Sequence, residues 1–155
     1  MSIDTDNTSC ASVPLPTDMS GHVSFSIGDT HLVCGGRYTK DCYSLNVSSR
    51  EWEYHSTLNS ERWDASAVVI GDRVWVVGGS GDSKSTEYLT DGRWTVGPSV
   101  PGRGVYVSYM THLNDSHIVI IGGTYDRRQV RLMDITTETW TDWTDRVSLP
   151  YPVET

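Results

Sequence analysis

The sequence predicts an all-β fold made of three repeated, four-stranded antiparallel modules. An apolar strand that runs into a pair of glycines occurs three times, at His31–Gly36, Val74–Gly79 and Ile118–Gly123. The glycine pairs begin 43 and then 44 residues apart, and a fixed period in this range is typical of solenoids and propellers. A repeat of this size needs stacked neighbours, so we expect one body built from several modules.

Each period contains four short stretches of strand composition separated by turn residues. The first period predicts strands at His22–Ile27, His31–Cys34, Cys42–Val47 and Glu51–Ser56. The second predicts strands at Ala65–Ile70, Arg73–Val77 and Ser85–Leu89 and a short strand around Trp94. The third predicts strands at Val105–His112, His117–Ile121, Val130–Ile135 and Thr139–Trp143. The glycines that follow the second strand of each period favour positive φ angles and close approach of another backbone.

A tryptophan recurs near the end of each period. It follows an apolar or aromatic residue by six or seven positions in the pairs Leu45 and Trp52, Tyr88 and Trp94, and Met133 and Trp140. Because the three tryptophans recur at nearly the same position within each period, we expect them to pack one sheet against the next.

This combination of a Gly-Gly strand, a following strand with a large apolar residue and a downstream Trp resembles the kelch repeat. The resemblance covers residues 21–143 and implies a β-propeller whose blades are four-stranded antiparallel sheets. It divides the chain into a flexible leader (1–19), three blades (20–60, 61–101 and 102–146) and a tail or start of a further blade (147–155). Leu45 and Met133 depart from the family by standing where kelch modules usually carry Tyr.

Three blades are fewer than a closed propeller needs, since the smallest propellers have about four. We therefore expect an incomplete or open propeller, either a fragment of a larger one or a partial ring. Open blade edges favour self-association, which makes a second copy one expected partner.

The charge balance limits the classes of partner. The chain has 12 basic and 20 acidic residues, a net charge of −8, which repels phosphate backbones and anionic lipid. We expect neither nucleic acid nor membrane as a partner, and no apolar run approaches the roughly 20 residues of a membrane span. The N-terminus lacks the pattern of a signal peptide, so the compartment is undefined and cytoplasmic by default. The sequons at Asn7, Asn46 and Asn114 favour a secreted parent instead.

The three cysteines, Cys10, Cys34 and Cys42, contain no CxxC pair that would indicate zinc. Cys34 ends one expected strand and Cys42 enters the next, so a cross-strand disulfide fits the geometry. The alternative is a pair of small buried thiols, because Val77 and Ile121 occupy the place of Cys34 in the other periods. Of these two interpretations, the pair of free thiols is favoured over the disulfide, and both stay open.

No catalytic pattern stands out. The five histidines lack metal-ligand spacing, and no GxSxG nucleophile signature occurs. We expect a protein that is not an enzyme, with no cofactor, no metal and no catalytic residue. The alternatives are a fragment of a kelch-propeller enzyme of the copper oxidase or sugar-modifying type, or a secreted carbohydrate-binding or adhesion protein.

The loops after the glycine pairs and between the modules should share one face, because every module has the same strand order. They supply the candidate binding residues Arg37, Tyr38, Arg62, Trp63, Arg103, Tyr106, Tyr125, Arg127 and Arg128. Arginine pairs bidentately with carboxylates and aromatic rings provide rigid contact area, so the expected partner is a protein or peptide of acidic character. The kelch resemblance implies this role for Arg62 and Arg103, which stand similarly near the start of a blade. The alternative is that both arginines brace neighbouring blades.

Overall fold

The computed structural model describes residues 13–147 and contains three separate four-stranded antiparallel sheets, or blades. Blade 1 consists of β1 (Val23–Ile27), β2 (Thr30–Cys34), β3 (Asp41–Asn46) and β4 (Glu51–Thr57). Blade 2 consists of β5 (Ser66–Ile70), β6 (Arg73–Val77), β7 (Thr86–Thr90) and β8 (Arg93–Val96). Blade 3 consists of β9 (Tyr109–Asn114), β10 (His117–Ile121), β11 (Val130–Asp134) and β12 (Thr139–Asp142). The predicted fold class is confirmed: residues 13–147 form an all-β, open propeller segment of three blades.

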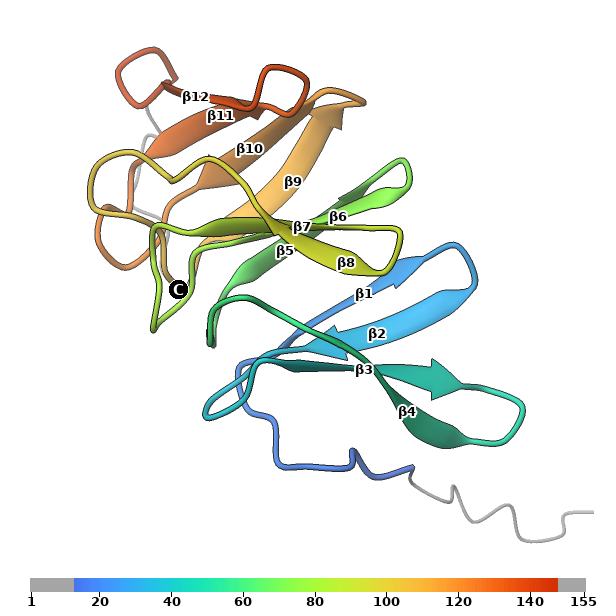
Figure 1. Ribbon diagram of the computed structural model, residues 1–155. Helices are drawn as coiled ribbons and strands as arrows, with labels where there is room; N and C mark the ends of the chain where they lie inside the picture. Colours follow the sequence, from blue (N-terminus) through green and yellow to red (C-terminus); the bar gives the residue numbers. More distant parts are fainter. Residues whose placement is uncertain (1–12, 148–155) are drawn as a thin grey trace, which may run out of the picture.

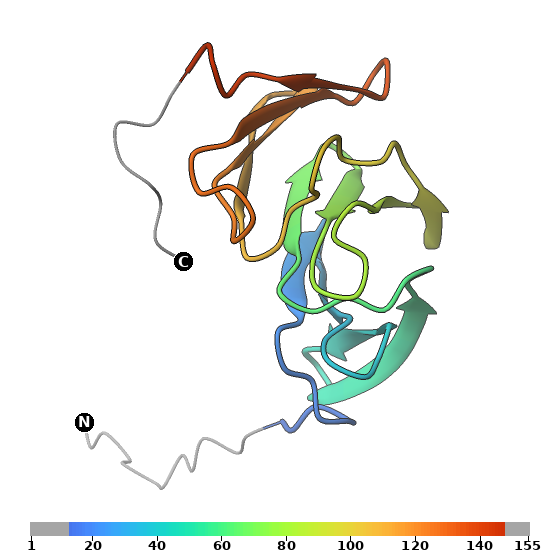
Figure 2. The same cartoon turned by 90° about the vertical axis from the view of Figure 1, so that its left-hand side faces the viewer.

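The blades follow one another along an arc that does not close (Figure 2). The first strand of the middle blade, β5, contacts the first strands of both neighbours, β1 and β9. A backbone ladder joins the segments that lead into these strands, because the N–H of Asp64 donates to the carbonyl of Gly21 at 2.7 Å and the N–H of Val107 donates to that of Asp64 at 3.1 Å. Consecutive blades are therefore hydrogen-bonded as well as packed.

The apolar core lies between blades. Val74 and Val76 of β6 pack towards blade 1 with Leu32, whereas Trp75 and Val77 pack towards blade 3. A strand of the middle blade must be apolar on both faces, since side chains alternate across a sheet and both faces are covered. This explains why an uninterrupted apolar run precedes the glycine pair of blade 2.

The paired glycines make the joints between blades. Gly36 donates its N–H to the carbonyl of Arg62 at 2.9 Å, and Gly79 donates to Val105 at 3.0 Å. A Cβ on Gly35 would lie 2.9 Å from the same Arg62 oxygen, and its φ is +67°. The predicted close approach of backbone is confirmed, and the approaching chain is the start of the next blade.

Trp94 and Trp140 pack between blades as expected, whereas Trp52 lies on the outer side of blade 1 and contacts the leader segment instead. The register pairs Leu89, not Tyr88, with Trp94, in line with Leu45 and Trp52 in blade 1. Trp94 reaches blade 1, where its ring meets Phe25 edge to face at 6.4 Å between centroids.

The first strand of blade 3 begins at Tyr109, so the predicted start at Val105 is wrong. The N–H of Val105 donates to the carbonyl of Ser83, and Val107 adopts a φ of +47°. These residues belong to the joint with blade 2. A β-branched residue at positive φ is strained, which ends the extended segment before Tyr109.

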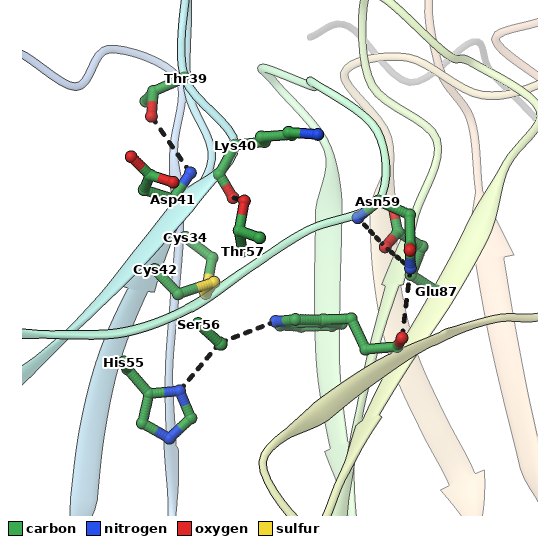
Figure 3. The surroundings of a disulfide bond; sticks show 11 residues. Cys34, Thr39, Lys40, Asp41, Cys42, His55, Ser56, Thr57, Asn59 and Glu87 are labelled. Atoms are coloured by element: carbon green, nitrogen blue, oxygen red, sulfur yellow. Dashed lines mark hydrogen bonds between the residues drawn. A yellow bond between two sulfur atoms is a disulfide. The ribbon is translucent and has the colours of Figure 1, made fainter.

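Cys34 and Cys42 form a disulfide between β2 and β3, and both residues are fully buried (Figure 3). Of the two alternatives for these cysteines, the cross-strand bridge is present and the favoured free-thiol interpretation is wrong. The bridge closes the loop that carries Arg37 and Tyr38.

Part of the predicted flexible leader has a defined position. The indole N–H of Trp52 donates to the carbonyl of Val13 at 3.3 Å, which places this segment beside β4. Residues 1–12 of the leader and 148–155 of the predicted tail lie outside the described residues. Within 13–147, no helix has the length and apolar character needed to cross a membrane.

Candidate peptide-binding face

The antiparallel strand order gives each blade two ends (Figure 1). One end carries the tight turns β1–β2 and β3–β4 and their counterparts; we call it the hairpin face. The other carries the β2–β3 loops and the segments between blades, residues 35–40, 58–65, 78–85, 97–108 and 122–129; we call it the loop face. All nine predicted binding residues lie in loop-face segments.

Aromatic residues recur at equivalent places on the loop face. The N–H of Ser80 donates to the carbonyl of Trp63 and that of Thr124 donates to Tyr106, which makes Trp63 and Tyr106 equivalent. Tyr38 and Tyr125 are also equivalent, since each stands two residues after a glycine pair. The repeat thus places aromatic side chains at two kinds of position on one face.

In blade 1, Tyr38 is the most exposed of these aromatics, at 80%. The guanidinium of Arg37 lies 5.2 Å from the centre of its ring, and the backbone N–H of Tyr38 donates to Glu61 at 2.9 Å. The carboxylate of Glu61 therefore ties this loop to the segment that leads into blade 2. Glu61 was not among the predicted residues, and no local signal in the sequence marks it.

In blade 3, the rings of Tyr106 and Tyr125 lie 6.2 Å apart between centroids and are tilted by 44°. Tyr125 is 47% exposed, and Tyr106 is half-buried beneath it. In blade 2 the place of Tyr125 is taken by Gly81, which lies over the half-buried ring of Trp63.

The structure leaves Arg103, Arg127 and Arg128 exposed on the loop face. Arg103 lies between Gly102 and Gly104 in the segment that joins blades 2 and 3. Arg127 and Arg128 are in the β10–β11 loop, which is shaped by a hydrogen bond from the N–H of Arg128 to the Asp126 carboxylate at 3.1 Å. No side-chain contact joins these arginines into one cluster within the described residues.

Arg62 does not belong to the binding surface. Its side chain is 1% exposed and forms an ion pair with Glu87, which is 0% exposed. Its guanidinium also donates to the carbonyl of Gly78 at 2.8 Å. Arg62 therefore braces neighbouring blades, and the prediction that Arg62 contacts a binding partner is wrong. The presumed equivalence with Arg103 is wrong as well, since the residue that takes the place of Arg62 in blade 3 is Val105.

Two buried polar residues of blade 3, Gln129 and Arg131, were not predicted from the sequence. Gln129 donates its amide to the carbonyl of Gly122 at 2.6 Å, and Arg131 donates to the carbonyl of Gly104 at 3.4 Å. Burial lowers the pKa of Arg131, and the nearby carboxylates of Asp142 and Asp126 oppose this shift. The sequence could have indicated Arg131, because aligning the repeats puts Arg131 where blade 2 has the oppositely charged Glu87.

Charge is divided unevenly between the two ends of the described blades. The hairpin half holds three basic and eight acidic residues, whereas the loop half holds nine of each. The basic residues of the loop half are Arg37, Lys40, Arg62, Lys84, Arg103, Arg127, Arg128, Arg131 and Arg146. An acidic ligand is therefore repelled by the hairpin face and not by the loop face.

Other kinds of site find little support in the described residues. Between 13 and 147, no three His, Cys, Asp or Glu side chains are grouped so that they could hold a metal ion. A hollow of about 570 Å³ on the hairpin face lies between blades 2 and 3, lined by Asp72, Arg73, Asp115 and Glu138 among others.

No protein-family model matches the sequence. No curated protein sequence matches it either. A solved structure described as "Structure of YjhT" is similar in fold, with a TM-score of 0.71 at 16% sequence identity. The similarity covers 82% of this chain and 56% of that one, so the chain spans a little over half the length of that structure. At this identity the likeness concerns the fold alone.

Proposed function

We propose that this chain is a kelch-type repeat segment that binds a protein or peptide of acidic character through its loop face and has no catalytic role. The observation that carries the proposal is the recurrence of aromatic rings at equivalent loop-face positions, beside exposed arginines. Tyr38, Trp63, Tyr106 and Tyr125 offer rigid contact area, and Arg37, Arg103, Arg127 and Arg128 offer donors for carboxylates. Aromatic and arginine side chains are the residues enriched at protein interfaces.

The experiment is a binding measurement with a short fluorescent peptide of alternating Glu and Gly, compared with the same peptide containing Gln. Fluorescence anisotropy should show that the Glu peptide binds more tightly, and that Arg37→Ala, Arg103→Ala and Arg127→Ala each weaken it. Arg93→Ala is the matched control, because Arg93 is an exposed arginine on the hairpin side. Equal effects of all four substitutions would show that only net charge matters and would refute the loop face.

A secreted carbohydrate-binding or adhesion protein is the second candidate, because one observation favours an oxidising compartment. Cys34 and Cys42 are joined, and disulfides persist mainly in extracellular and similar environments. The sequon residues Asn46 and Asn114 are exposed at the ends of β3 and β9 on the hairpin face, away from the loop face. Retained binding to a glycan array by a chain whose loop-face arginines are replaced would favour this candidate.

Self-association is a further part of the proposal, and the two outer flanks of the described blades differ in their suitability for it. On blade 3, Tyr109 and Leu113 are 59% and 55% exposed. The register makes Tyr109 the equivalent of Ser66 in blade 2, whose hydroxyl contacts Ser108 at the joint with blade 3, and Leu113 is the unpaired residue at the bulge of β9. On blade 1, Ser24 and Ser26 stand where blade 2 has the apolar Ala67 and Val69. We expect Leu113→Glu to abolish concentration-dependent dimers in analytical ultracentrifugation and Ser26→Glu to leave them unchanged. The reverse pattern would assign association to blade 1.

A further inference from the structure

Blade 2 contains a site that binds a carboxylate, and the side chain of Glu87 occupies it. Glu87 is the second residue of β7 and lies under the segment that joins blades 1 and 2. Its carboxylate accepts the backbone N–H of Asn59 at 2.6 Å and that of Ser60 at 3.0 Å, and it pairs with the guanidinium of Arg62 (Figure 3 shows Asn59 and Glu87). Two linker N–H groups and an arginine thus hold one carboxylate.

Blade 3 has the opposite charge at the same place. The strand register pairs Val76 with Glu87 and Ile120 with Arg131, so Arg131 is the equivalent of Glu87. Val105 replaces Arg62. The ion pair of blade 2 is therefore absent from blade 3, and a cation lies under the joining segment without an anion.

Arg131 is buried and incompletely paired. It is 6% exposed, its Nε has no hydrogen-bond partner, and no carboxylate lies within ion-pair distance among the described residues. The facing carboxylate of Asp142 is engaged by the hydroxyl and N–H of Thr144, which lower its pKa. Asp126, the other acidic neighbour, accepts the N–H of Arg128. A buried guanidinium without a paired anion is costly, and an added carboxylate would offset that cost.

The end of the Arg131 side chain lies directly under an exposed glycine. A Cβ on Gly102 would be 3.1 Å from Nη2, so any larger residue would cover this nitrogen. Arg103 follows and is exposed, and the N–H groups of Gly102 and Arg103 have no backbone acceptor within the described residues. The groups that hold Glu87 in blade 2, linker N–H groups and a guanidinium, are thus present in blade 3 and unoccupied by any described carboxylate.

We propose that Arg131, together with the Gly102–Arg103 backbone and the Arg103 side chain, binds a carboxylate of the acidic ligand on the loop face. This subsite would bind one Asp or Glu side chain of the ligand. The proposal rests on the proposed function. Guanidinium and backbone N–H groups suit a carboxylate because they supply several donors from fixed directions. Arg131 is the buried anchor, and Arg103 is the exposed contact.

The first experiment uses acetate as the smallest carboxylate and does not depend on any peptide. Sodium acetate is titrated into ¹⁵N-labelled protein at constant ionic strength, with sodium chloride as the reference, while the arginine Nε–H signals are followed by NMR. The Arg131 signal, assigned by its loss in Arg131→Gln, should shift saturably with acetate. A shift no larger than that of Arg93, which is exposed on the hairpin side, would overturn the proposal.

The second experiment uses the Glu-Gly peptide. Loss of a charge-assisted hydrogen bond costs roughly 1.5–3 kcal/mol, so Arg131→Gln should weaken binding about tenfold or more. Arg93→Gln removes the same charge and should change affinity less than about twofold. Gly102→Ala keeps Arg131 but covers Nη2, and it should also weaken binding; amide spectra of each variant establish that it is folded.

The outcomes separate the two proposals. Peptide binding that is unchanged in both Arg131→Gln and Gly102→Ala would refute the subsite and leave the loop face intact. An acetate shift at Arg131 without any peptide binding would support a carboxylate site and refute the peptide-binding function.

Discussion

The buried ion pair between Arg62 and Glu87 is expected to be a determinant of stability. The two side chains are 1% and 0% exposed and meet at the joint between blades 1 and 2. Glu87 also accepts two backbone N–H groups of the joining segment, and Arg62 also donates to the carbonyl of Gly78. The pair therefore satisfies groups from both blades.

Removing one partner leaves the other charge buried and unpaired. This typically costs about 3–5 kcal/mol, which is a large share of the roughly 5–15 kcal/mol of a folded domain. We expect Arg62→Met and Glu87→Gln each to lower the free energy of unfolding by about 3–5 kcal/mol. The double variant has no unpaired charge, and Gln retains an acceptor for the linker, so it should lose about as much as one single variant and not the sum.

The assay is urea unfolding of the four proteins at one pH, followed by tryptophan fluorescence. The double-mutant cycle should give a coupling energy of about 3 kcal/mol or more, at or above the upper end of the range for contacting residues. Leu89→Ala is a useful reference, because it damages the same interface without removing a charge. Single variants that lose less than about 1 kcal/mol, or losses that simply add, would refute the reasoning from burial.

Three further predictions concern the described structure. Replacing both Cys34 and Cys42 by Ala should lower the free energy of unfolding by roughly 2.5 kcal/mol, from the entropy of a closed loop of about nine residues; urea midpoints that are equal with and without reductant would contradict this. Val107→Asn should raise the free energy of unfolding by about 1 kcal/mol, because Asn tolerates the φ of +47°, and an unchanged thermal midpoint would show that the position is not strained. Backbone N–H groups of Thr137 and Thr136 lower the pKa of Asp134 below its ordinary value of 3.8, so its stabilising contribution is full above that pH and is lost as the pH falls through the lowered pKa. A ¹³C carboxyl titration should give this lower pKa, and Asp134→Asn, which keeps the acceptor oxygen, should remove that part of the acid sensitivity.

The repeat pattern predicted most of the fold. The strand order, the joints at Gly35-Gly36 and Gly78-Gly79, and the shared loop face all follow from local composition recurring at one period. The boundary errors occurred where the chain leaves that local pattern. Val105 to Ser108 has strand composition, but its hydrogen bonds go to the preceding blade, so the strand begins later.

The candidate site was predicted less well than the fold. The loop positions of Arg37, Arg103, Arg127 and Arg128 are exposed as predicted, because polar side chains on connecting loops face water. Arg62 also lies in a connecting segment, yet it is buried. Its partner Glu87 is 25 residues away in sequence, in the third strand after it, and nothing in the local sequence indicates that the two meet.

The sequence by itself determined that this protein is a series of equivalent blades, since period, strand alternation and glycine placement are local properties that any reader of the chain can count. Only the tertiary structure decided which arginines are exposed and which are buried, whether two cysteines face one another, and where a charge stands without its partner. These depend on strand register and on the space beneath each joint. A difference of one residue in register or in a linker changes whether a side chain reaches solvent or a buried carboxylate, as the contrast between Glu87 and Arg131 shows.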